Sequence, residues 1–335
     1  MKRLPAAAII CGFVFHCFPS LADDSSAVLG AGGLVLTKSA NIRMAREDLR
    51  ISPNSVKVRY EFVNDSSKDV DTIVAFPLPD IDLYEFSGSP LGTVKEETPN
   101  FVGFELTVGG KRVQTTAEEK AVFKGKDVTA TVRAAGIPIN MAGTDLYKRL
   151  PKLSTDARRA LVRADLLEID GPKGEDINGD DFHPKWTAQT KFWWRQRFPA
   201  GKTVVIEHSY QPVTGQSFFS DVELSSNESG SYYAKTYCFD EPTKAALRAR
   251  VAARKKSSPD NPLLNTYSTD FVLTTANNWK GPIGHFHLAL DKLKPDNVLS
   301  LCWADGLKKT GETTFEWTRE NFAPKHDVKM LVVGG

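Results

Sequence analysis

The sequence lacks the short motifs that usually mark an enzyme. It has no Gly-x-Ser-x-Gly nucleophile elbow, no His-Glu-x-x-His pair and no Cys-x-x-Cys spacing. The glycine-rich stretch 30–33 follows no strand pattern, and it lacks the lysine and hydroxyl residue of a phosphate-binding loop. These absences favour a non-catalytic protein, although a catalytic set assembled from distant positions would leave no such motif.

An excess of charge is also missing. The chain has 43 Lys and Arg against 41 Asp and Glu, and Lys2 and Arg3 belong to a predicted leader, so the rest of the chain is balanced. A nucleic-acid-binding protein needs a cationic surface. We therefore expect no nucleic-acid partner and no general adsorption to anionic membranes.

Long apolar runs are confined to the start of the chain. Basic residues 2–3 precede an apolar stretch that ends near Phe18, and Ser20 and Ala22 stand three places and one place before a polar segment that begins at Asp23. This pattern predicts a signal peptide over residues 1–22, cleavage after Ala22 and export to the periplasm or beyond. No later run is long enough for a transmembrane segment.

Cysteine is scarce. Two of the four cysteines lie in the predicted leader, which leaves Cys238 and Cys302 for the exported chain. Because exported proteins meet an oxidising environment, this even pair predicts a disulfide, with two separate buried thiols as the alternative.

What is present is a series of short alternating segments. Val56, Val58, Tyr60 and Phe62 alternate with charged residues, which is typical of a strand with one buried face. Further strands are expected at 72–78, 232–239, 267–275, 283–290, 298–303, 313–317 and 328–333, with hairpins over 104–113 and over 190–198 plus 203–210. The fold class predicted from this pattern is mainly β: an antiparallel β-sandwich in two packed halves with a few helical insertions.

Two helices interrupt the strands. One is expected near 154–168, where apolar residues form a stripe, and a second near 241–256, where Pro242 occupies an early position. The chain is expected to divide into an N-terminal β-sandwich over 23–216 and a C-terminal β-rich domain over 217–335.

Several segments together resemble a known family. The chain is similar to a bacterial secreted family called domain of unknown function 4424, which has no assigned activity. The resemblance extends over the mature chain and is carried by Asp24-Ser25-Ser26-Ala27, Gly32-Gly33-Leu34-Val35, Glu47-Asp48-Leu49-Arg50-Ile51-Ser52, Ala75-Phe76-Pro77-Leu78-Pro79-Asp80-Ile81-Asp82, Phe198-Pro199-Ala200-Gly201, Tyr210-Gln211-Pro212 and Asn278-Trp279-Lys280-Gly281-Pro282-Ile283-Gly284.

The first half also resembles, more weakly, the vault/inter-alpha-trypsin domain. The similar segments are Asn64, the run 76–79, the hairpin 104–113, and residues 119–121 ahead of 125–126. That module is a β-sandwich that supports contacts with other proteins, so this resemblance implies a scaffold that binds a partner.

Two sets of residues are candidate metal ligands. Asp176, Asn178 and Asp180 offer oxygen ligands on alternate residues, as a calcium loop does, but the glycine and the distal acidic ligand are misplaced, and a solvated acidic loop is the alternative. His285 and His287 leave one face of an expected strand and could ligate zinc or copper with a third residue; a wet strand face is the alternative.

One candidate contact surface stands out. On the expected strand 190–198, Trp193, Arg195 and Arg197 share a face opposite apolar residues, and tryptophan with arginine is typical of interfaces. The alternative is that the arginines only cover the ring.

The function predicted is an exported non-catalytic envelope protein, a β-sandwich scaffold that binds another protein or a surface polymer. The alternative is an extracytoplasmic hydrolase with a site around His285, His287 and Asp176.

Overall fold

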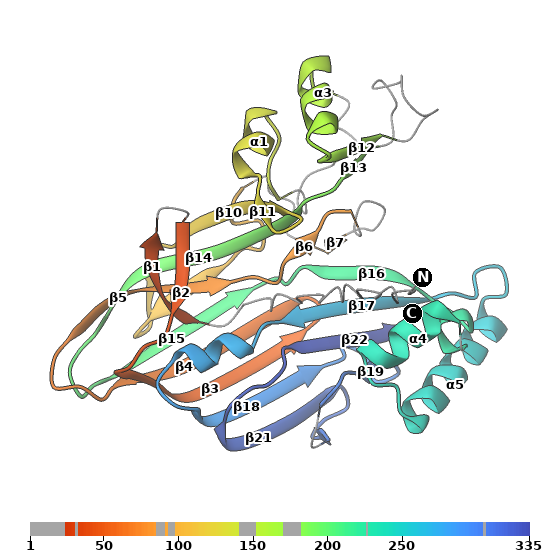
Figure 1. Cartoon of the computed structure of the whole chain (residues 1–335). Coiled ribbons are helices and arrows are strands. Elements are labelled where there is room, and N and C mark those ends of the chain that lie inside the picture. Colours follow the sequence, from red (N-terminus) through yellow and green to blue (C-terminus); the bar gives the residue numbers. More distant parts are fainter. Residues whose placement is uncertain are drawn as a thin grey trace, which may run out of the picture.

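The computed structural model of the protein describes residues 24–30, 33–84, 91–92, 98–140, 152–169, 182–225, 227–303 and 306–335. The chain is mainly β, with 47% strand and 19% helix, and antiparallel sheets pack on one another (Figure 1). The predicted fold class is confirmed. The leader over 1–22 lies outside the described residues, and among those residues no helix is long and apolar enough to cross a membrane.

Two large sheets form the sandwich. The upper sheet of Figure 1 has the order β11-β10-β14-β5-β1-β2, with β6 also paired to β14. Its strands are β1 (Ser25–Gly30), β2 (Gly33–Thr37), β5 (Val70–Pro77), β6 (Ile81–Asp82), β10 (Thr116–Phe123), β11 (Lys126–Asp127) and β14 (Thr187–Phe198). The lower sheet has the order β20-β21-β18-β3-β4-β15-β8-β9. Its strands are β3 (Ile42–Ser52), β4 (Ser55–Asn64), β8 (Glu105–Val108), β9 (Lys111–Val113), β15 (Thr203–Tyr210), β18 (Ile283–Asp291), β20 (Lys308–Lys309) and β21 (Thr314–Phe322).

Two smaller sheets complete the β structure. The third sheet has the order β19-β22-β17-β16-β7, and β12 (Leu167–Ile169) pairs with β13 (Phe182–Pro184) in a separate two-stranded ribbon. The strands of the third sheet are β7 (Leu91–Gly92), β16 (Thr214–Phe219), β17 (Leu264–Phe271), β19 (Val298–Ser300) and β22 (Val328–Gly334).

The core lies between the sheets, where period-two alternation places it. The alternating residues of β4 bury Val58, Tyr60 and Phe62 against Phe76 of β5 and Phe192 of β14, all within one hydrophobic cluster. Their neighbours in sequence face outward. This one-face burial is why the sandwich could be predicted from the sequence.

The expected hairpin over 190–198 and 203–210 is wrong. β14 pairs with β5, β6 and β10 in the upper sheet, whereas β15 pairs with β4 and β8 in the lower sheet. The turn between them is a corner at which the chain passes from one sheet to the other. Buried Asn64 closes this corner, because its side-chain amide donates to the carbonyl oxygens of Lys68 and Phe198 at 2.8 Å each.

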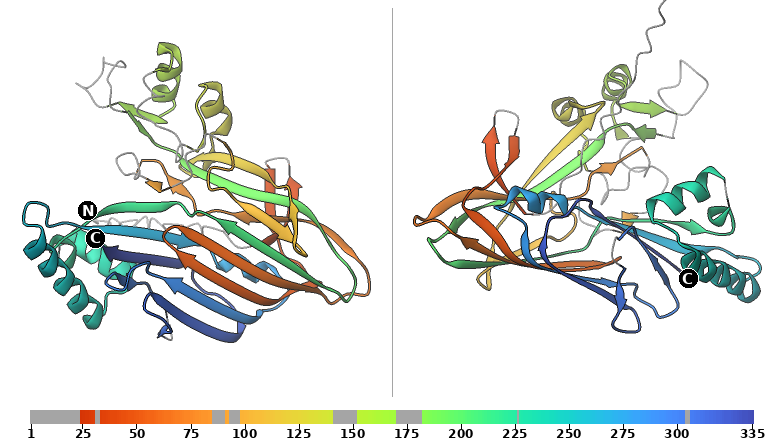
Figure 2. Two further views of the ribbon diagram at one scale, coloured as in Figure 1. Left: turned by 180° about the vertical axis from the view of Figure 1, so that it is seen from behind. Right: turned by 60° about the horizontal axis from the view of Figure 1, so that its bottom comes forward.

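The helices lie outside the sandwich. They are α1 (Thr129–Ala134), α3 (Thr155–Arg163), α4 (Glu228–Thr236) and α5 (Glu241–Ser257), with short 3₁₀ turns η2 (Val222–Leu224) and η3 (Thr274–Asn278). Figure 2 shows α4 and α5 together at one end of the molecule. α5 agrees with the helix expected near 241–256, and Asp240 caps it by accepting from the Thr243 N–H.

The helix expected near 154–168 is shorter than predicted. Ser154 caps α3, and the helix ends at Arg163 because Asp165 turns into the left-handed region with φ 60° while the Leu166 N–H bonds back to the Leu161 carbonyl. Leu167 then enters β12. Of the apolar stripe, only Leu161 is buried within the helix itself.

The strand expected at 232–239 is also wrong, because this segment lies largely in α4. Asn227 caps the helix by accepting from the Gly230 N–H at 2.8 Å. Tyr233 and Tyr237 then stand one turn apart, with ring centroids separated by 5.9 Å. The aromatic residues that favour a strand in the sequence therefore pack along one side of a helix.

The expected domain boundary at 216–217 falls inside β16. β3, from before the boundary, pairs in parallel with β18, from after it, and one hydrophobic cluster contains Leu49 and Phe62 together with Phe271 and Met330. Segments on both sides of the boundary therefore share a sheet and a core, since strands far apart in sequence are neighbours in the sandwich.

Candidate functional site

β14 presents the candidate contact residues as the alternation predicts. Phe192, Trp194 and Phe198 are buried in the core, whereas Trp193, Arg195 and Arg197 lie on the opposite, outer face of the upper sheet. The structure therefore brings the three predicted residues to one surface, although their surroundings differ.

Trp193 is covered by the hairpin of β1 and β2. It is partly buried against a small cluster that contains Ala27, Leu34 and Ile73. The hairpin is held there because the Leu34 N–H donates to the Glu118 carboxylate at 2.8 Å. Trp193 therefore packs beneath the hairpin, and only part of its ring is accessible to a partner.

Arg197 is held by the corner between the sheets. Its guanidinium forms an ion pair with Asp69, and the same carboxylate accepts from the Ala200 backbone N–H at 2.8 Å. These bonds, from Ala200 first and then from Arg197, lower the pKa of the Asp69 carboxyl. Arg197 thus has a structural partner at the position where β14 ends.

Arg195 is exposed, as Arg197 is, but its charge has no partner among the residues that the structure describes. Its cross-strand neighbour on β5 is the apolar Ile73. Together with Val28 and Leu29 of β1, these residues line a groove of about 620 Å³, hereafter the β14 groove.

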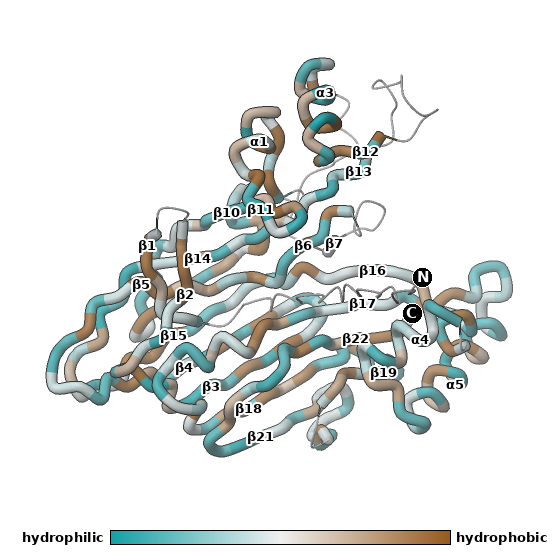
Figure 3. The backbone as a smooth tube through the Cα atoms, viewed as in Figure 1, coloured by the Kyte–Doolittle hydropathy of each residue, from teal (hydrophilic) through white to brown (hydrophobic). Residues whose placement is uncertain are grey.

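One wall of the β14 groove is apolar and exposed. Val28 is 50% exposed and Leu29 is 56% exposed, and Val35 of β2 is 53% exposed on the same hairpin. Figure 3 shows this hairpin, coloured as hydrophobic, standing at the outer side of the upper sheet. Aliphatic side chains gathered on an exposed hairpin are typical of a contact surface.

The predicted histidine pair lies on the lower sheet. His285 and His287 share the outer face of β18, as predicted, but each faces carboxylates: His285 Nδ1 lies 2.5 Å from Glu320 Oε1, and His287 lies 3.5 Å from Asp48 and 3.7 Å from Glu316. Among the described residues, no group of three or more His, Cys, Asp or Glu side chains is placed to hold a metal ion.

Two predicted sites remain, the candidate calcium ligands and the cysteine pair. Asp176, Asn178 and Asp180, the candidate calcium ligands, lie outside them. Cys238 and Cys302 are joined by a disulfide, with Cα atoms 4.9 Å apart. Both cysteines lie within segments expected as strands, 232–239 and 298–303, but the bond joins the chain just after α4 to the chain just after β19.

Sequence reasoning missed a recess of about 230 Å³ between β6, β17 and α4. Asp270, Tyr237 and Lys329 line it, and the Lys329 ammonium lies 3.6 Å from the Asp270 carboxylate. Desolvation raises the pKa of Asp270 and that of Tyr237. The strand misassigned at 232–239 concealed this recess, because Tyr237 follows directly after α4.

A second missed feature is His208, which is buried inside the sandwich. Its ring is surrounded by Tyr60, Phe76, Phe104 and Trp194, with centroids 4.9 to 5.6 Å away. Desolvation lowers the pKa of His208 to about 3. The alternation of β15 places His208 on the buried face together with Ile206 and Tyr210, and this was the available signal.

Comparison with known proteins identifies the family. The chain belongs to the family described as Domain of unknown function (DUF4424), whose model matches residues 22–331. No curated protein matches the chain. A solved structure from Legionella pneumophila, provisionally described as a nutrient binding protein, is similar at 15% identity and a TM-score of 0.43, covering 93% of this chain and 72% of that one. The weaker resemblance to the vault/inter-alpha-trypsin domain finds no support in these comparisons.

Proposed function

We propose that this member of the DUF4424 family is an exported, non-catalytic envelope protein that binds another protein at the β14 groove. The observation that carries the proposal is the exposed pair Val28 and Leu29 beside Arg195, a cation that has no ion-pair partner among the described residues. Buried apolar contacts together with an arginine are typical of residues that dominate binding energy. The signal-like sequence at 1–22 and the disulfide support export, because disulfides persist in oxidising compartments.

The groove favours a protein over a surface polymer. A sugar chain would use an open aromatic face and hydrogen-bonding groups, but Trp193 lies under the β1–β2 hairpin. The exposed side chains are aliphatic, and their burial yields free energy only against another apolar surface. We therefore infer a partner that offers an apolar side chain to Leu29 and an acidic side chain to Arg195.

Each of these residues is expected to contribute a modest share of the binding free energy. Burying the exposed half of Leu29 contributes about 1 kcal/mol, which is about fivefold in affinity. A charge-assisted hydrogen bond from Arg195 contributes about 1.5–3 kcal/mol when it is desolvated. Reversing the charge at Arg195 therefore weakens binding more than trimming Leu29 does.

Site-specific photocrosslinking tests the proposal in the native envelope. A photoreactive side chain at position 28 should capture one defined envelope protein, and capture should fall in high salt and in the Arg195→Glu variant. The same photoreactive side chain at Phe218, which is 61% exposed on β16, is the matched control and should not capture that protein.

Arg248→Glu, which reverses the charge of an exposed residue on α5, is the matched charge control and should leave capture unchanged. The proposal is contradicted if both positions capture the same proteins, or if Arg195→Glu and Arg248→Glu reduce capture equally. Binding of a neutral polysaccharide that competes with capture would instead favour the surface polymer.

A further inference from the structure

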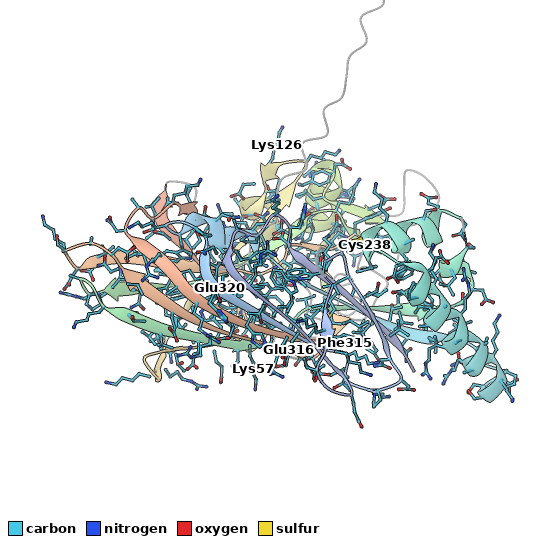
Figure 4. All side chains as sticks on the ribbon, turned by 90° about the horizontal axis from the view of Figure 1, so that it is seen from below. Lys57, Lys126, Cys238, Phe315, Glu316 and Glu320 are labelled. Carbon is cyan, nitrogen blue, oxygen red and sulfur yellow. A yellow bond between two sulfur atoms is a disulfide. The ribbon has the colours of Figure 1, made fainter. Side chains whose placement is uncertain are left out.

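The outer face of the lower sheet is a grid of charged side chains in cross-strand rows. One row places His287, Asp48, Arg59, Glu207 and Thr107 on successive strands, in register. Within this row the charges are compensated, since Arg59 lies 3.9 Å from Asp48 and 3.8 Å from Glu207. Figure 4 views this face, with Lys57, Glu316 and Glu320 marked on it.

The adjacent row breaks this pattern. It contains Ala289, Arg50, Lys57, Ser209 and Glu105 in register, so that Arg50 and Lys57 stand directly opposite each other on β3 and β4. Like charges in this position are destabilising. Neither side chain forms an ion pair or a side-chain hydrogen bond with any residue that the structure describes, and both are exposed.

The two cations also border a hollow. The small residues Ala289 and Ser209 flank them in the row, and the hollow, of about 430 Å³, is lined by all four of these residues. Arg50 can donate two parallel hydrogen bonds from its planar guanidinium, Lys57 supplies a compact positive charge, and the Ser209 hydroxyl can donate a further bond. Two cations that line one hollow and have no ion-pair partner among the described residues can bind an anion.

We propose that Arg50, Lys57 and Ser209 form a binding site for the carboxylate of a small organic acid. The other lining residues decide between classes of anion: Asp48, Glu105 and Glu207 also border the hollow. Their negative charge disfavours a dianion such as phosphate more than a singly charged carboxylate, and they can accept hydrogen bonds from hydroxyl groups of the ligand. The site lies on the opposite sheet from the β14 groove and does not depend on the proposed protein partner.

The test is a titration of the full exported chain with glucuronate, with glucose as the uncharged counterpart and inorganic phosphate as the competing anion, all at constant ionic strength. Glucuronate should shift the Nε–H resonance of Arg50 in a saturable way, and glucose should not. Lys57→Gln and Arg50→Gln should each weaken binding about tenfold, the loss expected for one charge-assisted hydrogen bond.

Lys68→Gln and Arg248→Gln, which neutralise exposed cations outside the hollow, are the matched controls and should bind glucuronate as the wild type does. Lys57→Gln should also leave the melting temperature unchanged or higher, because it removes a like-charge contact and no described partner. The proposal is overturned if glucuronate does not bind, if phosphate binds as tightly, or if the control variants weaken binding equally.

Discussion

Acidification should destabilise this protein through His208. The side chain is fully buried in its ring of aromatic residues, and its Nε2 lies 3.5 Å from Oδ1 of Asp24, another buried residue. Burial disfavours the imidazolium form, so the pKa in the folded protein falls from 6.5 to about 3. In the unfolded chain the ring titrates at its ordinary value.

The size of the effect follows from proton linkage. Between pH 6.5 and pH 3 the unfolded chain binds a proton that the folded protein does not, so stability is present above pH 6.5 and is lost as the pH falls. One pKa unit corresponds to about 1.4 kcal/mol. Lowering the pH from 7 to 5 should therefore reduce the free energy of unfolding by about 2 kcal/mol through this residue alone.

Urea unfolding at pH 7 and pH 5 measures this loss. Carboxylates also titrate in this range, so the quantity to compare is the pH-dependent loss in the wild type against that in His208→Gln, which cannot be protonated. The variant has its own cost from altered packing, but that cost is the same at both pH values. We expect the wild type to lose about 2 kcal/mol more than the variant.

Equal losses in the two proteins would refute the reasoning. They would mean that Asp24 holds His208 as an imidazolium in the folded state, so that its pKa is not depressed. The Asp24→Asn variant separates the two cases: it should leave the pH dependence of the wild type unchanged if His208 is neutral, and increase it if the ion pair exists.

Three further perturbations test the fold. Replacing both Cys238 and Cys302 by serine should lower the free energy of unfolding by about 4 kcal/mol, because the bond closes a loop of 64 residues; a loss below about 1 kcal/mol in chemical denaturation would contradict this. Asn64→Ala should cost about 1–3 kcal/mol by removing the side-chain hydrogen bonds that close the corner, one of them buried, and an unchanged denaturation midpoint would argue against that role. Gly284→Ala should also destabilise, because its Cβ would lie 2.5 Å from a backbone oxygen of β3, whereas Gly311→Ala, with its nearest contact at 3.6 Å, should be neutral in the same assay.

Local patterns in the sequence were sufficient for the class of fold. Alternation along β4 and β14 reports which side of each strand is buried, because side chains on a strand point to opposite faces by geometry alone. The disulfide followed from the count of cysteines in the predicted exported chain. The same local reading misassigned 232–239, where aromatic residues favour a strand but the Asn227 cap and the spacing of Tyr233 and Tyr237 support a helix.

The short hairpin predicted over 104–113 is confirmed as the pair β8–β9, but pairing between strands far apart in the chain was beyond the sequence. The turn after β14 looks like a hairpin turn, yet it joins two sheets, since each flanking strand finds its hydrogen-bond partners elsewhere in the chain. The candidate surface shows the same limit: Trp193, Arg195 and Arg197 share one face as the alternation predicts, but the structure covers the first, pairs the third with Asp69 and leaves Arg195 exposed.

The sequence by itself determined many of the strands, their buried faces and the pair of cysteines, because these depend on residues next to one another or on composition. Only the tertiary structure decided that Val28 and Leu29 stand beside Arg195 and that Arg50 faces Lys57. Such neighbours are set by the register and packing of strands from distant parts of the chain. Those interactions are non-local, and no single segment of the sequence specifies them.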